Sequence, residues 1–168
     1  RPRVLETNPG TATTGYALVD SDDDPRLVDC GAIVTPAGIA LPQRLLIIYR
    51  ELCALILHYQ PQAAAVEELF FSKNVRTAMS VGQARGVVLL AAAQAAVPIY
   101  HYKPSEVKQA VAGYGAATKP QMQEMVRLLL GLDAVLTPDD VADAVAIAIC
   151  HAHGAQWNRL MSDDEALS

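Results

Sequence analysis

The sequence predicts an α/β protein in which helices flank a mixed β-sheet. Two observations lead to this class. The first part of the chain contains three short strand-like runs joined by tight turns, whereas the rest alternates helical and strand-like segments. The chain has 168 residues, of which 52 % are hydrophobic, and this is enough for one domain with a substantial aliphatic core.

The first three predicted strands form an antiparallel meander. They cover residues 3–7, 15–19 and 27–35. The turns between them contain the segment Asn8-Pro9-Gly10 and a run of serine and aspartates that ends at Pro25, and both compositions are typical of turns. Because such short connections join antiparallel neighbours, the three strands should be adjacent in the sheet.

The remaining segments alternate between helix and strand. An apolar stripe that includes Leu45, Ile48 and Leu52 predicts the first helix, and Pro61 ends it. Thr137 and Pro138 suit the opening of the last helix. Helices are expected at residues 41–59, 77–96, 105–112, 121–130 and about 137–153, and strands at 63–67 and 97–100.

A single domain is expected over residues 1–157, followed by an acidic, flexible tail over residues 158–168. No apolar run approaches the roughly 18 residues that cross a bilayer, and the first residues do not resemble a signal peptide. Cys30, Cys53 and Cys150 are widely spaced, which suits free thiols in a reducing compartment. We therefore expect a cytoplasmic protein without a membrane partner.

Charge is unevenly distributed along the chain, whose net charge is −5. Residues 69–132 contain seven lysines and arginines but only two acidic residues. A basic middle within an acidic chain is typical of a local phosphate-binding face, which would suit a nucleic acid. A solvated helical surface with ordinary lysines explains the same distribution, and charge alone favours that simpler explanation.

Four polar residues, Asn8, Glu67, Asp140 and Asp143, lie at or near the ends of predicted elements. Asn8 and Glu67 follow strands, and Asp140 and Asp143 share one face of the last helix. Mg²⁺ and Mn²⁺ prefer carboxylate oxygens, and two such ions about 4 Å apart support phosphodiester chemistry. Taken alone, Glu67 is explained as a strand-end charge, and Asp140 as an acid favoured by the helix dipole. Together the four positions predict a two-metal site.

Cys150, His151 and His153 form another group of possible metal ligands near the end of the last predicted helix. Positions one and three apart on a helix do not converge as a closed zinc site requires, and a fourth ligand is missing. We therefore interpret these residues as structural.

Several motifs, in order along the chain, resemble one known family. They are NPGT (8–11) with TGY (14–16), VEELF (66–70), GQARG (82–86), VKQAV (107–111) and ADAVAIA (142–148). Together they resemble the RuvC-type Holliday junction resolvases over residues 3–153. The resemblance implies a ribonuclease H-like fold with a mixed five-stranded sheet, and a homodimer that nicks two strands of a four-way DNA junction. It also implies two Mg²⁺ or Mn²⁺ ions per active site, and branch-migration partners of the RuvA and RuvB type.

The resemblance also assigns residue roles. The four acidic positions of the family fall on Asn8, Glu67, Asp140 and Asp143, which would bind metal and act in catalysis. Lys119, a further catalytic candidate, and Lys108 match lysines that the family keeps near its site, although each is also explained as a surface residue on a helix flank. Phe70 matches an aromatic that stacks on junction bases. The predicted DNA-binding residues are Phe70, Lys73, Asn74, Arg76, Arg85, Lys108 and Lys119.

The first motif departs from the family pattern, which reads Gly-Ile-Asp-Pro-Gly where this chain has Glu6-Thr7-Asn8-Pro9-Gly10. An amide oxygen is neutral and cannot bridge two cations as a carboxylate does. We therefore expect weaker metal binding, and cleavage that is slower by several tens-fold or more, since about 1.4 kcal/mol is a factor of ten. Glu6 shares the face of Asn8 and either extends toward the site or is buried as an uncompensated charge.

Three function classes follow. The leading one is a structure-selective DNA endonuclease. The second is a junction-binding protein without catalysis, which Asn8 supports. The third is a phosphotransferase of the actin-like type, which would need a second phosphate loop and a much longer chain than this one.

Overall fold

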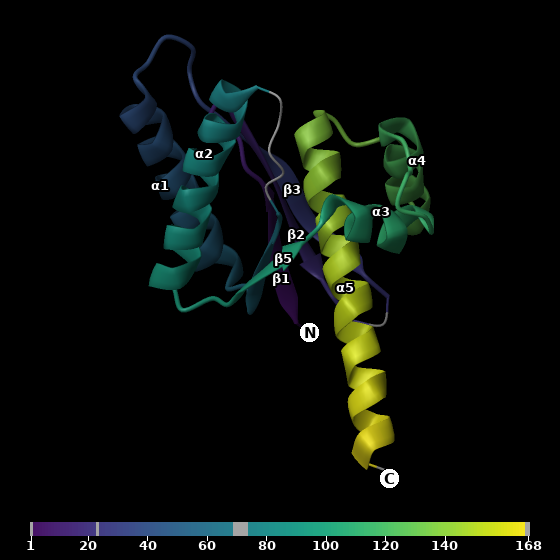
Figure 1. Cartoon of the computed structure of the whole chain (residues 1–168). Helices are drawn as coiled ribbons and strands as arrows, with labels where there is room; N and C mark the ends of the chain where they lie inside the picture. Colours follow the sequence, from purple (N-terminus) through teal and green to yellow (C-terminus); the bar gives the residue numbers. More distant parts are fainter. Residues whose placement is uncertain (1, 23, 69–73, 167–168) are drawn as a thin grey trace.

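A computed structural model describes residues 2–22, 24–68 and 74–166 of the chain (Figure 1). Five strands and five helices are present in these residues, so the predicted α/β class is confirmed. In chain order they are β1 (Arg3–Asn8), β2 (Thr13–Asp20), β3 (Arg26–Val34), α1 (Leu41–Tyr59), β4 (Ala63–Glu67), α2 (Val75–Gln94), β5 (Ile99–Tyr102), α3 (Pro104–Ala112), α4 (Lys119–Leu129) and α5 (Asp139–Ala166).

The five strands form one mixed sheet in the order β3-β2-β1-β4-β5. The pairs β1–β2 and β2–β3 are antiparallel, which confirms the predicted meander, whereas β1–β4 and β4–β5 are parallel. In the parallel pair of β1 and β4, Thr7 lies opposite Val66. The next residues, Asn8 and Glu67, therefore end two neighbouring strands at the same edge of the sheet, where ligands collect in open α/β sheets.

Helices cover both faces of the sheet (Figure 1). One face packs against α1 and α2, where Leu5 and Leu18 of the sheet join a buried cluster with Ile48. The other face packs against α5, and α3 and α4 lie beyond α5; here Val4 and Val145 belong to a second cluster. Neighbouring residues of β1 enter different clusters because side chains of a strand alternate between its faces.

Side-chain caps explain why two helices begin earlier than predicted. The Asn74 side chain accepts hydrogen bonds from the backbone N–H groups of Arg76 and Thr77, so α2 begins at Val75 rather than at residue 77. The Thr118 side chain caps α4, which begins at Lys119 rather than at residue 121. Asn74, which the sequence predicted as a DNA contact, therefore has a structural role at the start of α2.

Two other boundaries were predicted wrongly. The backbone N–H of Val97 donates to the backbone oxygen of Ala92 and closes the turn that follows α2, so β5 begins two residues later than predicted. The last helix continues to Ala166 rather than ending near residue 153. A single glycine, Gly154, costs a helix only about 1 kcal/mol, and no proline follows it. The backbone of residues 158–166 is helical, and the flexibility of this tail stays a prediction.

Within the described ranges, no helix is both long enough and apolar enough to cross a membrane. The longest helix, α5, instead packs along the sheet and contributes Val141, Val145 and Ile149 to the buried interior. The first turn of α5 also brings Asp140 and Asp143 to the edge of the sheet at which β1 ends.

Candidate active site

Asn8, Asp140 and Asp143 meet where β1 ends against the first turns of α5. The side-chain nitrogen Nδ2 of Asn8 donates to Oδ1 of Asp140 and to Oδ2 of Asp143, each at 3.2 Å. The two aspartates are three residues apart on the helix, so both carboxylates project toward the end of the strand. Ionised carboxylates have acceptor oxygens only, and the amide nitrogen of Asn8 is therefore the group that faces them.

The close approach of α5 to the sheet depends on Gly15, which lies opposite Asn8 in the β1–β2 ladder. A Cβ atom at this position would be 2.0 Å from the backbone oxygen of Asp140 and 2.3 Å from its carbonyl carbon. Only glycine therefore lets the first turn of α5 lie against β2 with Asp140 beside Asn8. A glycine within a strand is the sequence signal for such an approach, although it does not identify the neighbour.

Glu67, at the end of β4, lies beside Asp143 and Lys108. Partial burial raises the pKa of the Glu67 carboxyl; the negative charge of Asp143 raises it further, and Lys108 opposes both effects. Glu67 lines a cleft of about 280 Å³ together with Lys108, Lys119 and Asp143. The structure thus brings three predicted acids and both predicted lysines to one edge of the sheet.

Lys119, at the start of α4, is paired with the acids at the start of α5. Its Nζ lies 3.2 Å from Oδ2 of Asp139 and 3.7 Å from Oδ2 of Asp143. Partial burial lowers the pKa of Lys119, but the negative charges of Asp143, Asp139 and Asp140 outweigh this and raise the pKa overall. Burial raises the pKa of Asp143, and Lys119 partly offsets that effect. The lysine therefore reduces the net negative charge of the acid cluster.

The family model described as "Crossover junction endodeoxyribonuclease RuvC" matches residues 4–151. The chain belongs to the RuvC family. The RuvC of Chloroflexus aggregans is 64 % identical over 154 residues, which cover 91 % of this chain and 94 % of that protein. The RuvC of Roseiflexus sp. is 57 % identical over 162 residues, which cover 96 % of each chain.

Solved RuvC structures share the fold. The Thermus thermophilus RuvC structure has a TM-score of 0.86 and 36 % identity, and the match covers 93 % of this chain and 96 % of that one. The T. thermophilus RuvC in complex with a Holliday junction substrate has a TM-score of 0.89 and the same identity, with 94 % and 97 % covered. The ribonuclease H-like mixed sheet is therefore confirmed. RuvC proteins are metal-dependent nucleases as a family.

The site of this RuvC chain does not fit a metal centre as it is arranged. Glu67, Asp140 and Asp143 supply the oxygen ligands that a hard divalent cation prefers. Asn8, however, presents N–H donors to the two aspartates, and a cation that used the same oxygens would have to displace them. Among the described residues, no three acids, histidines or cysteines are grouped so that they could hold a metal ion. The four-residue metal site stays a prediction.

Glu6, two residues before Asn8, is fully buried on the face of the sheet that α5 covers. In the sheet, Glu6 is paired with Ala17 of β2 on one side and with Ala65 of β4 on the other. Its exposed fraction is 0 %. Within the described part of the chain, neither carboxyl oxygen has a hydrogen-bond partner. Burial raises the pKa of Glu6 well above its usual value. Of the two possibilities that the sequence left open, burial of an uncompensated acid is the one observed.

Tyr102 and His151 connect the end of β5 to α5, a contact that the sequence did not predict. The Tyr102 hydroxyl and Nδ1 of His151 are 2.6 Å apart. The backbone oxygen of Tyr102 accepts a hydrogen bond from the N–H of Glu68 at 2.7 Å. Together these contacts hold the ends of β4 and β5 against α5, and so they help to fix Glu67. Residues so far apart in the sequence gave no local signal.

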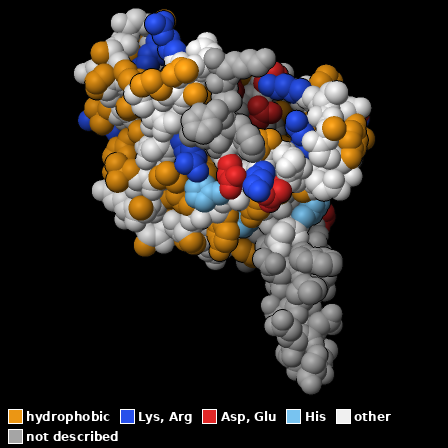
Figure 2. Space-filling model, viewed as in Figure 1, with side chains coloured by type: hydrophobic (Ala, Val, Ile, Leu, Met, Phe, Trp, Pro, Cys, Tyr) orange, Lys and Arg blue, Asp and Glu red, His pale blue; other side chains and the backbone are white. Residues whose placement is uncertain are grey.

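Of the other predicted DNA-binding residues, Arg76 and Arg85 belong to α2. Phe70 and Lys73 lie outside the described residues. Arg76 is exposed in the first turn of α2. Arg85 lies farther along this helix, where its Nη2 is 2.7 Å from Nδ1 of His101. Figure 2 shows acidic side chains recessed in a hollow near the start of α5, with basic side chains beside them.

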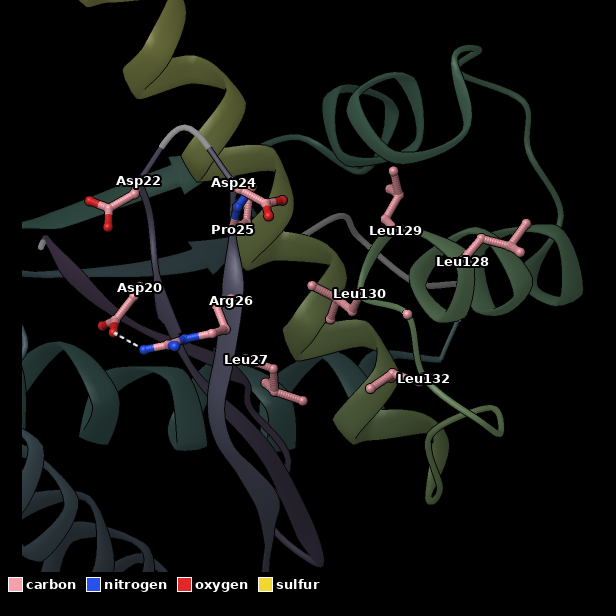
Figure 3. Close-up of a pocket in the computed structure, with 11 residues that line it drawn as sticks. Asp20, Asp22, Asp24, Pro25, Arg26, Leu27, Leu128, Leu129, Leu130 and Leu132 are labelled. Atoms are coloured by element: carbon pink, nitrogen blue, oxygen red, sulfur yellow. Dashed lines mark ion pairs between the residues drawn. The ribbon is translucent and has the colours of Figure 1, made fainter.

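A larger cleft, of about 920 Å³, lies at the opposite end of β1 (Figure 3). The β2–β3 connection forms one wall and the chain after α4 forms the other. The lining residues are Asp20, Asp22, Asp24, Pro25, Arg26, Leu27 and residues 128–132. Aspartates and leucines predominate, and this lining is unsuited to a phosphate backbone. The smaller cleft beside Glu67, with its two lysines, suits nucleic acid better.

Proposed function

We propose that this chain acts on four-way DNA junctions as a RuvC-type endonuclease that nicks two strands symmetrically, with its cleavage step slowed by Asn8. The convergence of the site carries the proposal: Glu67, Asp140 and Asp143 lie with Lys108 and Lys119 at one edge of the sheet. The Thermus thermophilus relative, solved in complex with a Holliday junction substrate, supports four-way DNA as the substrate class.

The residues of the cleft have distinct roles in this proposal. Lys108 and Lys119 would contact phosphates near the scissile bond, since an ammonium group is a compact charge that suits phosphate oxygens. If the Asn8 amide turned away from the two aspartates, Glu67, Asp140 and Asp143 would supply oxygen ligands for two Mg²⁺ or Mn²⁺ ions, which provide Lewis-acid chemistry in such nucleases. Three of the four family ligands are present, and Asn8 is the position at which this chain departs.

We also propose a homodimer, because symmetric nicking of two strands requires two active sites. The exposed apolar residues Val75, Met79 and Leu90 of α2 support this helix as the contact between subunits. Branch-migration proteins of the RuvA and RuvB type are proposed partners on the basis of the family resemblance. A cytoplasmic location suits the three free cysteines.

A junction-binding protein that does not cleave is the second candidate, and one observation favours it. Asn8 donates hydrogen bonds to both aspartates, so the acid pair of this chain is satisfied without a cation. The groups that would contact DNA, Lys108 and Lys119, line the neighbouring cleft and remain present in this arrangement. Binding and cleavage are therefore separable in this chain.

The test compares binding and nicking in the parent chain and in Asn8→Asp. Gel-shift titrations with a four-way junction and a linear duplex of the same sequence should show junction preference for both chains. With Mg²⁺ or Mn²⁺, the Asn8→Asp chain should nick the junction several tens-fold faster, or more. Equal, weak binding to both DNAs would refute a junction function. Cleavage by the parent at the rate of the variant would exclude both a slowed enzyme and a protein that only binds.

A further inference from the structure

We propose that the Asn8 amide group takes the place of a cation between Asp140 and Asp143 and thereby excludes divalent ions from the site. This differs from the simple loss of a ligand. A missing ligand makes cation binding weaker, whereas an occupied position must first be vacated. The inference rests on the proposed function only in taking these aspartates as the cation ligands of a RuvC-type site.

The geometry of the amide carries the proposal. An amide nitrogen has two hydrogens, and here each is directed at a different carboxylate, at equal distances of 3.2 Å. Hydrogen bonds to an ionised acceptor are about twice as strong as those between neutral groups. A cation that used Oδ1 of Asp140 and Oδ2 of Asp143 would have to break both hydrogen bonds before it could bind.

The backbone around Asn8 leaves the amide close to the aspartates. Asn8 is held in the β1–β2 ladder opposite Gly15, and α5 approaches the sheet at that glycine. Strand and helix are therefore fixed relative to each other, so a side chain, that of Asn8 or of an aspartate, must rotate to free the space.

Lys119 supplies a positive charge beside the neutral amide. Its Nζ lies 3.7 Å from Oδ2 of Asp143, the oxygen that also accepts from Asn8. One carboxylate oxygen is thus approached by both an amide and an ammonium group. The acid pair is compensated from within the chain, in agreement with the lack of a metal-binding group among the described residues.

The two explanations, a position occupied by the Asn8 amide and the simple loss of a ligand, predict opposite orders of cation affinity for the parent and Asn8→Ala. If Asn8 only lacks a charge, Asn8→Ala should bind Mn²⁺ no more tightly than the parent, because alanine supplies no oxygen at all. If the amide blocks the position, its removal should increase the affinity by about a hundredfold, the effect of two charge-assisted hydrogen bonds that no longer have to be broken. Asn8→Asp should bind most tightly, since it removes the amide and adds a ligand.

The experiment is a calorimetric titration of the full chain with MnCl₂, without DNA, for the parent, Asn8→Ala and Asn8→Asp. The expected order of affinity is aspartate, then alanine, then the parent. Gln43→Asp is the control, because it adds the same charge at the exposed start of α1, on the opposite face of the sheet, and should match the parent. An affinity of Asn8→Ala at or below that of the parent overturns the proposal, as does no Mn²⁺ binding by any of the variants.

A second measurement uses the parent chain alone and does not depend on the folding of a variant. The side-chain amide protons of Asn8 should exchange slowly with water, and their NMR signals should keep their positions when MgCl₂ is added to millimolar concentrations. A saturable shift of these signals with MgCl₂ overturns the proposal. Neither measurement uses DNA, so a failure of junction binding in the gel shift is distinguishable from a failure here.

Discussion

The two ends of β1 differ in whether their buried acids have partners. Near its start, the Asp20 carboxylate on the neighbouring strand is 5 % exposed; it accepts a hydrogen bond from Arg3 Nε at 2.9 Å and lies 3.9 Å from Arg26 (Figure 3). Near its end, Glu6 is fully buried, and within the described residues its carboxyl has no partner. At the start of β1, far from the candidate site, the buried carboxylate is thus paired with arginines. Close to the site, the buried carboxyl of Glu6 has no hydrogen-bond partner among the described residues. Local rules are often broken in this way near functional sites.

The largest effect should come from Gly15, because backbone contact rather than charge holds the site end together. In Gly15→Ala the new Cβ would overlap the backbone oxygen of Asp140, so α5 must move away from β2. We expect a loss of about 3 kcal/mol or more in the free energy of unfolding, measured with urea. Gly86→Ala is the matched control, since its Cβ would meet nothing within 4 Å and alanine favours a helix. Equal stabilities of the two variants would contradict this account.

The next largest effect should come from the start of β1, where Asp20 is paired with arginines. Arg3→Met removes the ion pair that the buried Asp20 makes at 2.9 Å, and we expect a loss of about 2–3 kcal/mol, because a buried carboxylate is destabilised when one of its charged partners is removed. Arg26→Met should cost less than about 1 kcal/mol, since the Arg26 side chain is 68 % exposed and lies farther from Asp20. Chemical unfolding of both variants measures the difference. A loss in Arg26→Met as large as in Arg3→Met would show that the start of β1 does not depend on its close pair.

A smaller effect, of opposite sign, should follow from replacing the unpaired acid. Glu6→Leu keeps a side chain of similar size and removes two buried oxygens that have no hydrogen-bond partner in the described part of the chain, so the free energy of unfolding should rise by about 1–3 kcal/mol. Since burial raises the pKa of Glu6, the folded parent retains a proton that the unfolded chain releases, and the parent loses stability as the pH rises above the usual pKa of a glutamate.

The gain from Glu6→Leu should therefore be larger at pH 8 than at pH 5. Thermal and urea unfolding at the two pH values provide the measurement. Glu6→Gln separates charge from shape, because it keeps unsatisfied polar atoms at the same place and should recover only the part of the gain that depends on pH. A less stable Glu6→Leu chain would mean that Glu6 has a stabilising contact and that the two ends of β1 are alike.

The same contrast explains what could be predicted from the sequence. The bounds of α1 and β4 follow from an apolar stripe, from Pro61 and from a short buried run, all of which are local signals. That Glu67 and Asp143 lie close together could be predicted from a strand end, a helix face and a family resemblance. The burial of Glu6 and the direction of the Asn8 amide could not be derived, because both depend on where α5 packs. Such packing joins residues more than a hundred positions apart.

Substitution of His151 should change the free energy of unfolding least. This residue is buried in a third way, as a neutral imidazole that contacts a neutral hydroxyl. It is 7 % exposed and contacts the Tyr102 hydroxyl, and burial lowers its pKa. Below the usual pKa of about 6.5 the unfolded chain binds a proton that the folded chain resists, so the parent loses stability as the pH falls from 7 to 5.

His151→Gln cannot take up that proton and should show a shallower loss over the same interval, even though it weakens the contact to Tyr102. Urea unfolding of the parent and of His151→Gln at pH 7, 6 and 5 provides the comparison. Parallel pH profiles would mean that His151 is protonated equally in the folded and unfolded chains. In that case Asp20 and His151 would both be buried with a partner and without cost to stability. Of the three residues compared, Glu6 alone would then lower the stability of the folded chain.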